Sequence, residues 1–215
     1  MSEAALRAFG AACVILSVII VLTANIVLPY MLPLPIGALL VVWWINASET
    51  SWADINYVIP PSWIAPIVAF VGGVALKLLL KTIVMPLLGA PAVNPAYHFL
   101  PHNNAQLPLA IVTMCVAGFA EETVFRGYLF ERLGSLHVTR AATVVITTML
   151  FALAHYSGQG LPGVEQAIIT GAVFGTIVAT RRSIVEAMCA HAAFDLTALA
   201  MIYFDAERAF ARVLR

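Results

Sequence analysis

Long apolar stretches separated by short polar links run along the whole sequence. No Asp, Glu, Lys or Arg occurs in residues 8–48, 55–76 or 141–164. A helix needs about 20 apolar residues to cross the roughly 30 Å hydrocarbon core of a bilayer. The pattern therefore predicts membrane-spanning helices near residues 11–29, 34–46, 63–88, 107–131, 141–156, 163–180 and 184–204.

These spans predict an all-α fold. In lipid, a helix satisfies its backbone hydrogen bonds within its own segment, and an open sheet cannot do so. We therefore expect a polytopic transmembrane helical bundle with about seven spans, in a range of six to eight. The range reflects residues 34–46, which are short and follow Pro29 and Pro33. They are either a crossing, a re-entrant segment or a kinked continuation of the first span.

The composition supports an integral, multi-pass membrane protein. Of the 215 residues, 62% are hydrophobic and 10% are charged, and the mean hydropathy is +0.96. The 11 basic and 11 acidic residues balance to a formal net charge of zero. With no excess of positive charge, nothing in the sequence indicates nucleic-acid binding.

Ionisable residues nevertheless occur inside three of the predicted helices. The first group is Glu121, Glu122 and Arg126, the second is His155, and the third is His191 with Asp195. Counted from the arginine that marks one end of each helix, at 1.5 Å per residue, these groups lie at depths of about 13 to 22 Å. All three helices thus bring ionisable groups to the middle of the bilayer. Because charge is costly there, such a cluster predicts a functional site.

The helical spacing indicates different roles for the two adjacent glutamates. Glu122 and Arg126 are four residues apart with the acid first, which is the favourable order for an ion pair along a helix. Glu121 is turned about 100° away from Glu122 on a helix with 3.6 residues per turn, so it is left for acid–base chemistry. His191 and Asp195 are also four residues apart and share one helix face.

Structural interpretations of the same residues stay open at this stage. The pair of Glu122 with Arg126 could hold helices together, and His155 could donate an interhelical hydrogen bond. His191 with Asp195 could be a local pair within one helix. The presence of all three groups at one depth favours a site over three separate structural contacts.

These residues resemble the motifs of the CPBP family of intramembrane proteases, which includes the CAAX prenyl endopeptidases and many bacterial members. The family pattern is Glu-Glu-x-x-x-Arg, then Phe-x-x-x-His, then His-x-x-x-Asn or Asp, on successive membrane helices. Here the three motifs occupy 121–126, 151–155 and 191–195, in that order. The resemblance divides the chain into N-terminal helices without a signature (1–106), a catalytic core (107–204) and a short polar tail (205–215).

The resemblance implies a glutamate-dependent endopeptidase that hydrolyses a peptide bond in a membrane-anchored protein or peptide, of the CAAX type or another. Glu121 would act with His155 to activate water, and His191 with Asp195 would bind or support the oxyanion. Glu122 and Arg126 would hold the helices in place. Since an ionised Asp195 can only accept hydrogen bonds, we expect it to orient His191 rather than contact the oxyanion directly. No cofactor is implied, and a bacterial inner membrane is the expected location.

Three alternatives remain for the function. A zinc metalloprotease could use His155, His191 and either Glu121 or Asp195 as ligands, although the sequence lacks a His-Glu-x-x-His motif. A non-catalytic scaffold or immunity protein could keep the cluster for packing. A proton-coupled transporter is disfavoured, because no matched pair of broken helices recurs in two halves.

Overall fold

The computed structural model describes residues 39–43, 45–46, 50–95 and 103–211, and all regular secondary structure in these ranges is helical. The predicted span 11–29 lies outside the described residues, and the predicted span 34–46 lies only partly within them. In the described part, the all-α prediction is confirmed.

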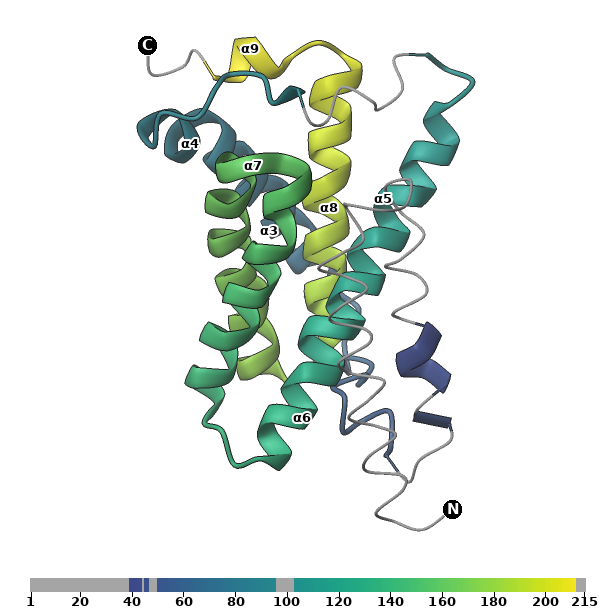
Figure 1. Cartoon of the computed structure of the whole chain (residues 1–215). Helices are drawn as coiled ribbons and strands as arrows, with labels where there is room; N and C mark the ends of the chain where they lie inside the picture. The colour runs from purple at the N-terminus through teal and green to yellow at the C-terminus, as the bar shows by residue number, and fades with distance from the viewer. Residues whose placement is uncertain (1–38, 44, 47–49, 96–102, 212–215) are drawn as a thin grey trace.

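Nine helical elements follow the N-terminal described residues (Figure 1). Two of them, η1 and η3, are π-helical segments. The elements are α3 (Ile64–Leu79), η1 (Leu80–Val84), α4 (Met85–Leu87), α5 (Leu107–Glu122), η3 (Thr123–Tyr128), α6 (Leu129–Ser135), α7 (Arg140–Arg181), α8 (Ile184–Tyr203) and α9 (Glu207–Phe210).

Several of these elements join into longer helices. The elements α3, η1 and α4 form one helix of 24 residues, and α5, η3 and α6 form one of 29 residues. Together with Gly158–Arg181 and α8, they are the four helices of the described part that are long and apolar enough to cross a membrane. The predicted helices at 63–88, 107–131, 163–180 and 184–204 are therefore present. The total of seven spans stays a prediction.

Helix α7 is a hairpin of two antiparallel arms (Figure 1). The chain reverses at Gly160, whose φ of 66° and ψ of −163° are accessible mainly to glycine. Across the hairpin, Gly175 lies against Val144 and Gly171 lies against Thr148. This arrangement corresponds to the two predicted helices at 141–156 and 163–180. The first arm, Arg140–Tyr156, is a shorter apolar helix.

The longest helices pack around α8. Helix α3 makes its most extensive contact with α8, and α5 packs on α8 from another side. The outer face of α3 is apolar and exposed, as at Ile64, Val68 and Val71. An apolar face of this extent is stable next to lipid, whereas in water it would favour aggregation. The bundle therefore buries α8 and presents α3 to the membrane.

The C-terminal segment folds back onto the bundle. Within residues 205–211, the described part of the predicted polar tail 205–215, Glu207–Phe210 forms the short helix α9. The Glu207 carboxylate lies 3.0 Å from Nζ of Lys81, which belongs to η1. This ion pair attaches the C-terminal segment to the end of the α3–η1–α4 helix.

Candidate functional site

A buried ion pair forms the foundation of the site. The guanidinium Nη1 of Arg126 donates to Oε1 of Glu122 at 2.7 Å, and neither side chain is exposed to solvent. Glu122 is the last residue of α5 and Arg126 lies in the π-helical segment η3, a kind of irregularity that often occurs at functional sites. The predicted ion pair between these two residues is thus present.

Arg126 also connects this helix to the α7 hairpin. Its Nη2 donates to the carbonyl oxygen of Gly171 at 3.3 Å, and its guanidinium carbon lies 4.4 Å from the centroid of the Phe151 ring. Gly171 permits this approach, because a Cβ atom there would lie 3.4 Å from Nη2 of Arg126 and closer still to Thr148. The arginine therefore links η3 to both arms of the hairpin.

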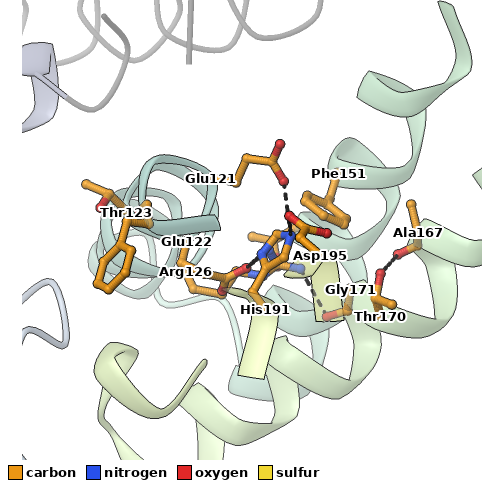
Figure 2. Close-up of polar contacts among 12 residues, drawn as sticks. Glu121, Glu122, Thr123, Arg126, Phe151, Ala167, Thr170, Gly171, His191 and Asp195 are labelled. Atoms are coloured by element: carbon orange, nitrogen blue, oxygen red, sulfur yellow. Dashed lines mark hydrogen bonds and ion pairs between the residues drawn. The ribbon is translucent and has the colours of Figure 1, made fainter. Parts of the chain in front are cut away.

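His191 of α8 lies at the centre of the cluster (Figure 2). Its Nδ1 is 2.8 Å from Oε1 of Glu122, the same oxygen that accepts from Arg126. Its Nε2 is 3.5 Å from Oε2 of Glu121 and 3.6 Å from Oδ2 of Asp195. Carboxylate oxygens accept hydrogen bonds, so acceptors face both ring nitrogens. This environment favours a His191 ring that carries a proton on each nitrogen.

Aromatic rings enclose the His191 imidazole. Phe174 stacks on it with ring centroids 4.9 Å apart and an interplanar angle of 28°. Phe151 presents its edge from the other arm of the α7 hairpin, with centroids 5.9 Å apart. Both phenylalanines are buried. They restrict the imidazole to one orientation, in which Nε2 faces Glu121 and Asp195.

Glu121 differs from Glu122 in its surroundings. Its side chain retains 13% exposure, and His191 is the only residue of the described part with which it forms an ion pair. Figure 2 shows the Glu121 carboxyl group apart from the buried ion pair and pointing toward His191. The separation expected from the helical spacing is present: one glutamate is paired with arginine, and the other is accessible.

His155 lies beside this cluster on the first arm of α7. Its Nδ1 is 2.8 Å from the carbonyl oxygen of Phe151, and its ring lies 4.5 Å from the Phe151 ring. A carbonyl oxygen only accepts, so Nδ1 carries the proton and Nε2 is left for another partner. Among the described residues, no hydrogen bond or ion pair joins His155 to Glu121. Any joint action of the two would therefore require a bridging water or substrate.

The structure thus brings together five of the six predicted site residues in one network of close contacts and places the sixth, His155, next to it through Phe151. The five come from α5, η3 and α8, and they are Glu121, Glu122, Arg126, His191 and Asp195. In the described part, no three His, Cys, Asp or Glu side chains are arranged to hold one metal ion. A zinc site stays an alternative prediction, which an experiment with a chelator can test.

A loop before α3 also supports the site, although the motifs give no sign of it. The amide of Asn56 donates to the carbonyl oxygen of Arg126 at 3.3 Å, and the Tyr57 hydroxyl lies 2.7 Å from Oγ1 of Thr123. Since Thr123 donates its own proton to Phe119, Tyr57 is the donor in this bond. Burial raises the pKa of Tyr57 above its ordinary value of 10.0. The hydroxyl therefore keeps its proton at neutral pH.

Lys77 of α3 is a second feature that the motif analysis did not single out. It is buried, and it lies in a span that was predicted from its apolar character alone. The sequence itself could have drawn attention to Lys77, because Lys77 and Lys81 are the only charged residues between Asp54 and Glu121. Their spacing of four residues places them on one helix face.

The fold and the site define a class: a helical membrane protein that buries a carboxylate–histidine cluster among its spans. The family model of type II CAAX prenyl endopeptidases, Rce1-like, matches residues 103–197. The matched segment contains all three motifs, so the resemblance to the CPBP family of proteases is confirmed over these residues. No curated protein and no solved structure matches the chain.

Proposed function

We propose that the protein is an intramembrane endopeptidase that hydrolyses a peptide bond in a membrane-anchored protein or peptide. The family match supports a peptidase. The observation that carries the proposal is the asymmetry of the two glutamates, since Glu122 forms a fully buried ion pair with Arg126 while Glu121 is partly exposed beside His191. We expect the protein to act as a multi-pass protein of a bacterial inner membrane.

In the proposed reaction, Glu121 is the general base. A water molecule between Glu121 and Nε2 of His155 attacks the carbonyl carbon of the scissile bond, and its proton passes to the Glu121 carboxylate. The π electrons of the carbonyl move onto its oxygen. His155 suits this role because Phe151 holds the proton on Nδ1, which leaves Nε2 to accept a hydrogen bond from the water.

His191 is the proposed electrophile. With both nitrogens protonated, its Nδ1 donates to Glu122 and its Nε2 is available to donate to the oxyanion. Asp195 lies on the same helix face and orients the ring through Nε2 in the absence of substrate. When the tetrahedral intermediate collapses, the carbon–nitrogen bond breaks. Protonated Glu121 then gives its proton to the leaving amine, which restores the carboxylate.

Glu122 and Arg126 have a positioning role in this proposal. They contact His191, Gly171 and Phe151, and thereby fix the helices that carry the reacting groups. The substrate is anchored in the membrane, and prenylated CAAX tails are one class that fits the family name. No cofactor is required by these steps.

The test is cleavage of membrane-embedded peptide substrates by purified protein, comparing the parent with Glu121→Gln. Loss of a general base lowers rates by about 10²- to 10⁴-fold, and we expect a loss of that size. Glu165→Gln is the matched control, because it makes the same chemical change in α7 outside the cluster. Both variants should unfold at the same temperature as the parent.

Adding a chelator to this cleavage assay distinguishes the glutamate-dependent peptidase from the zinc metalloprotease. Activity that survives EDTA and disappears in Glu121→Gln supports the glutamate-activated water. Activity that EDTA removes and zinc restores would indicate the metalloprotease instead. If folded parent protein cleaves none of a varied substrate panel, the peptidase proposal is wrong and a scaffold or immunity role gains support.

A further inference from the structure

A cleft separate from the carboxylate–histidine cluster opens where η1, α4, α9 and the bend of α7 meet. Figure 1 shows α4, α9 and the bend of α7 at the upper end of the bundle. Its polar lining comes from Lys77, Lys81, Asn94, Gln166 and Glu207. Ala198 of α8 also lines it, three residues beyond Asp195. The cleft therefore extends along α8 from the neighbourhood of the site toward one membrane surface.

Lys77 is the deepest charged residue of this cleft. It lies ten residues before Leu87, the last residue of a 24-residue helix, which corresponds to a depth of about 15 Å at 1.5 Å per residue. Its side chain points into the bundle and is 7% exposed. An ammonium group near the middle of a bilayer is costly unless it is paired or hydrated, and residues kept there commonly serve function.

The contacts of Lys77 leave its charge without a close anion. Nζ donates to Oε1 of Gln166 at 3.0 Å and lies 4.6 Å from the centroid of the Phe194 ring. Both partners are neutral. Within the described residues, no carboxylate oxygen lies within 4.0 Å of this Nζ. Asp195 is near enough to interact electrostatically, but the cation closest to it is His191 at 3.6 Å.

Lys81 provides the contrast on the same helix face. Its Nζ lies 3.0 Å from Oε1 of Glu207 and 2.8 Å from the carbonyl oxygen of Ala92. Two like charges four residues apart repel each other, and Glu207 forms a close ion pair with only the outer one. The cleft thus already binds one carboxylate, from the chain's own C-terminal segment, and leaves the inner ammonium without one.

The inner ammonium is close to the proposed reaction centre. Consecutive ring contacts connect His191 to Phe174 at 4.9 Å and Phe174 to Phe194 at 6.4 Å, and Phe194 contacts Nζ of Lys77. An extended chain covers about 3.3–3.6 Å per residue. A peptide held at His191 therefore reaches Lys77 within about five residues.

We propose that Lys77 and Gln166 form a carboxylate-binding subsite that selects substrates with a carboxylate within about five residues of the scissile bond. The inference rests on the proposed peptidase function. The carboxylate is supplied either by an acidic side chain or by the end of the peptide chain. Lys77 offers the remaining N–H donors of its ammonium, and Gln166 offers its amide N–H₂ group.

Binding to the non-cleaving Glu121→Gln protein in lipid nanodiscs tests this subsite. The probe is a fluorescent single-span peptide without other acidic residues, in three forms. One ends in a free carboxylate, one ends in an amide, and one ends in an amide but carries a single Asp near the end. We expect the carboxylate-bearing forms to bind at least about tenfold more tightly than the neutral amide.

The same binding measurement distinguishes an acidic side chain from the end of the peptide chain as the source of the carboxylate. Preference for the free terminus alone assigns the subsite to the chain end, and preference for both charged forms assigns it to any carboxylate. Equal binding of all three forms, or binding of none, overturns the subsite.

Variants of the two lysines make the test specific. Lys77→Gln, added to the same background, should abolish the preference, whereas Lys77→Arg should retain it. Lys81→Gln is the matched control and should also retain it, because Glu207 already occupies that ammonium. A preference that persists in folded Lys77→Gln protein contradicts the proposal. Unfolding temperatures of all variants verify that the protein is intact.

Cleavage by protein with Glu121 intact separates this inference from the proposed function. If the probes bind with the predicted preference and none is cleaved, the peptidase proposal fails and the subsite stands. If all three forms are cleaved equally well, the peptidase proposal stands and the subsite fails.

Discussion

Arg126 and Lys77 are two buried cations, and their surroundings differ. Arg126 has a carboxylate at 2.7 Å, a carbonyl oxygen at 3.3 Å and an aromatic face at 4.4 Å. Lys77 has a neutral amide and an aromatic face but no carboxylate within ion-pair distance in the described part of the chain. One cation has a carboxylate in direct contact, and the other does not.

This difference distinguishes a charge that stabilises the fold from a charge that can bind an incoming anion. Removing one partner of a buried ion pair leaves the other charge uncompensated, which is far more costly than removing a charge that has no partner. The contacts of Arg126 therefore make it part of the framework. Those of Lys77 leave it able to bind an incoming anion.

The largest loss of stability should come from removing Arg126, the cation that is paired with a carboxylate. Arg126→Met leaves Glu122 buried without its counter-charge, which should lower the free energy of unfolding by about 3–5 kcal/mol. Lys77→Met, the matched change in α3, should alter it by less than about 1 kcal/mol in either direction, because no carboxylate loses a close ion pair. Thermal unfolding of both proteins in the same detergent measures the difference. Equal losses would show that Lys77 is as structural as Arg126.

A second effect concerns how α3 is held against α8. A Cβ atom on Gly73 would lie 2.0 Å from the carbonyl oxygen of Ala190, so Gly73→Ala must push the helices apart. We expect a loss of about 1–3 kcal/mol, the usual range for overpacking. Gly72→Ala is the control, since nothing lies within 4 Å of a Cβ atom there.

The two glycine variants also test whether the position of α3 affects binding at Lys77. Lys77 lies one helical turn beyond Gly73, so displacement of α3 should weaken binding of the carboxylate probes as well as stability. The structure of the α3–α8 contact would be wrong if both alanine variants unfolded at the parent temperature.

The smallest effect is expected at Asp195. An asparagine retains an oxygen that accepts from His191 and adds an amide donor, so Asp195→Asn should keep peptidase activity within about threefold. Asp195→Ala removes the acceptor and should cost about tenfold, close to the value of one hydrogen bond. Steady-state kinetics on one substrate compare the two variants. If Asp195→Asn were as damaging as the alanine variant, the negative charge itself would be needed.

Much of the fold and part of the site could be predicted from local sequence. The helices at 63–88, 107–131, 163–180 and 184–204 follow from the lengths of apolar runs. The ion pair of Glu122 with Arg126 follows from a spacing of four residues within one helix. The π-helical segment η3 was not predicted, because its side chains satisfy an ordinary helical pattern equally well.

The sequence pattern did not predict the contacts between helices. That pattern paired His191 only with Asp195, whereas in the structure its shortest contact is with Glu122 of another helix, at 2.8 Å. Likewise, Tyr57 donates to Thr123 across a separation of 66 residues. Such partners depend on how whole helices rotate and approach, and no local spacing records this.

The sequence by itself determined that apolar helices would enclose a small set of ionisable groups, because the bilayer selects for length and hydrophobicity residue by residue. It also determined which glutamate has an arginine one turn away. Only the tertiary structure decided where the remaining charges point. Packing of α8 between α3 and α5 brought Glu121 and Glu122 next to His191, which Asp195 contacts from its own helix. It also left Lys77 beside a neutral amide and an aromatic ring, in a cleft that the linear pattern does not reveal.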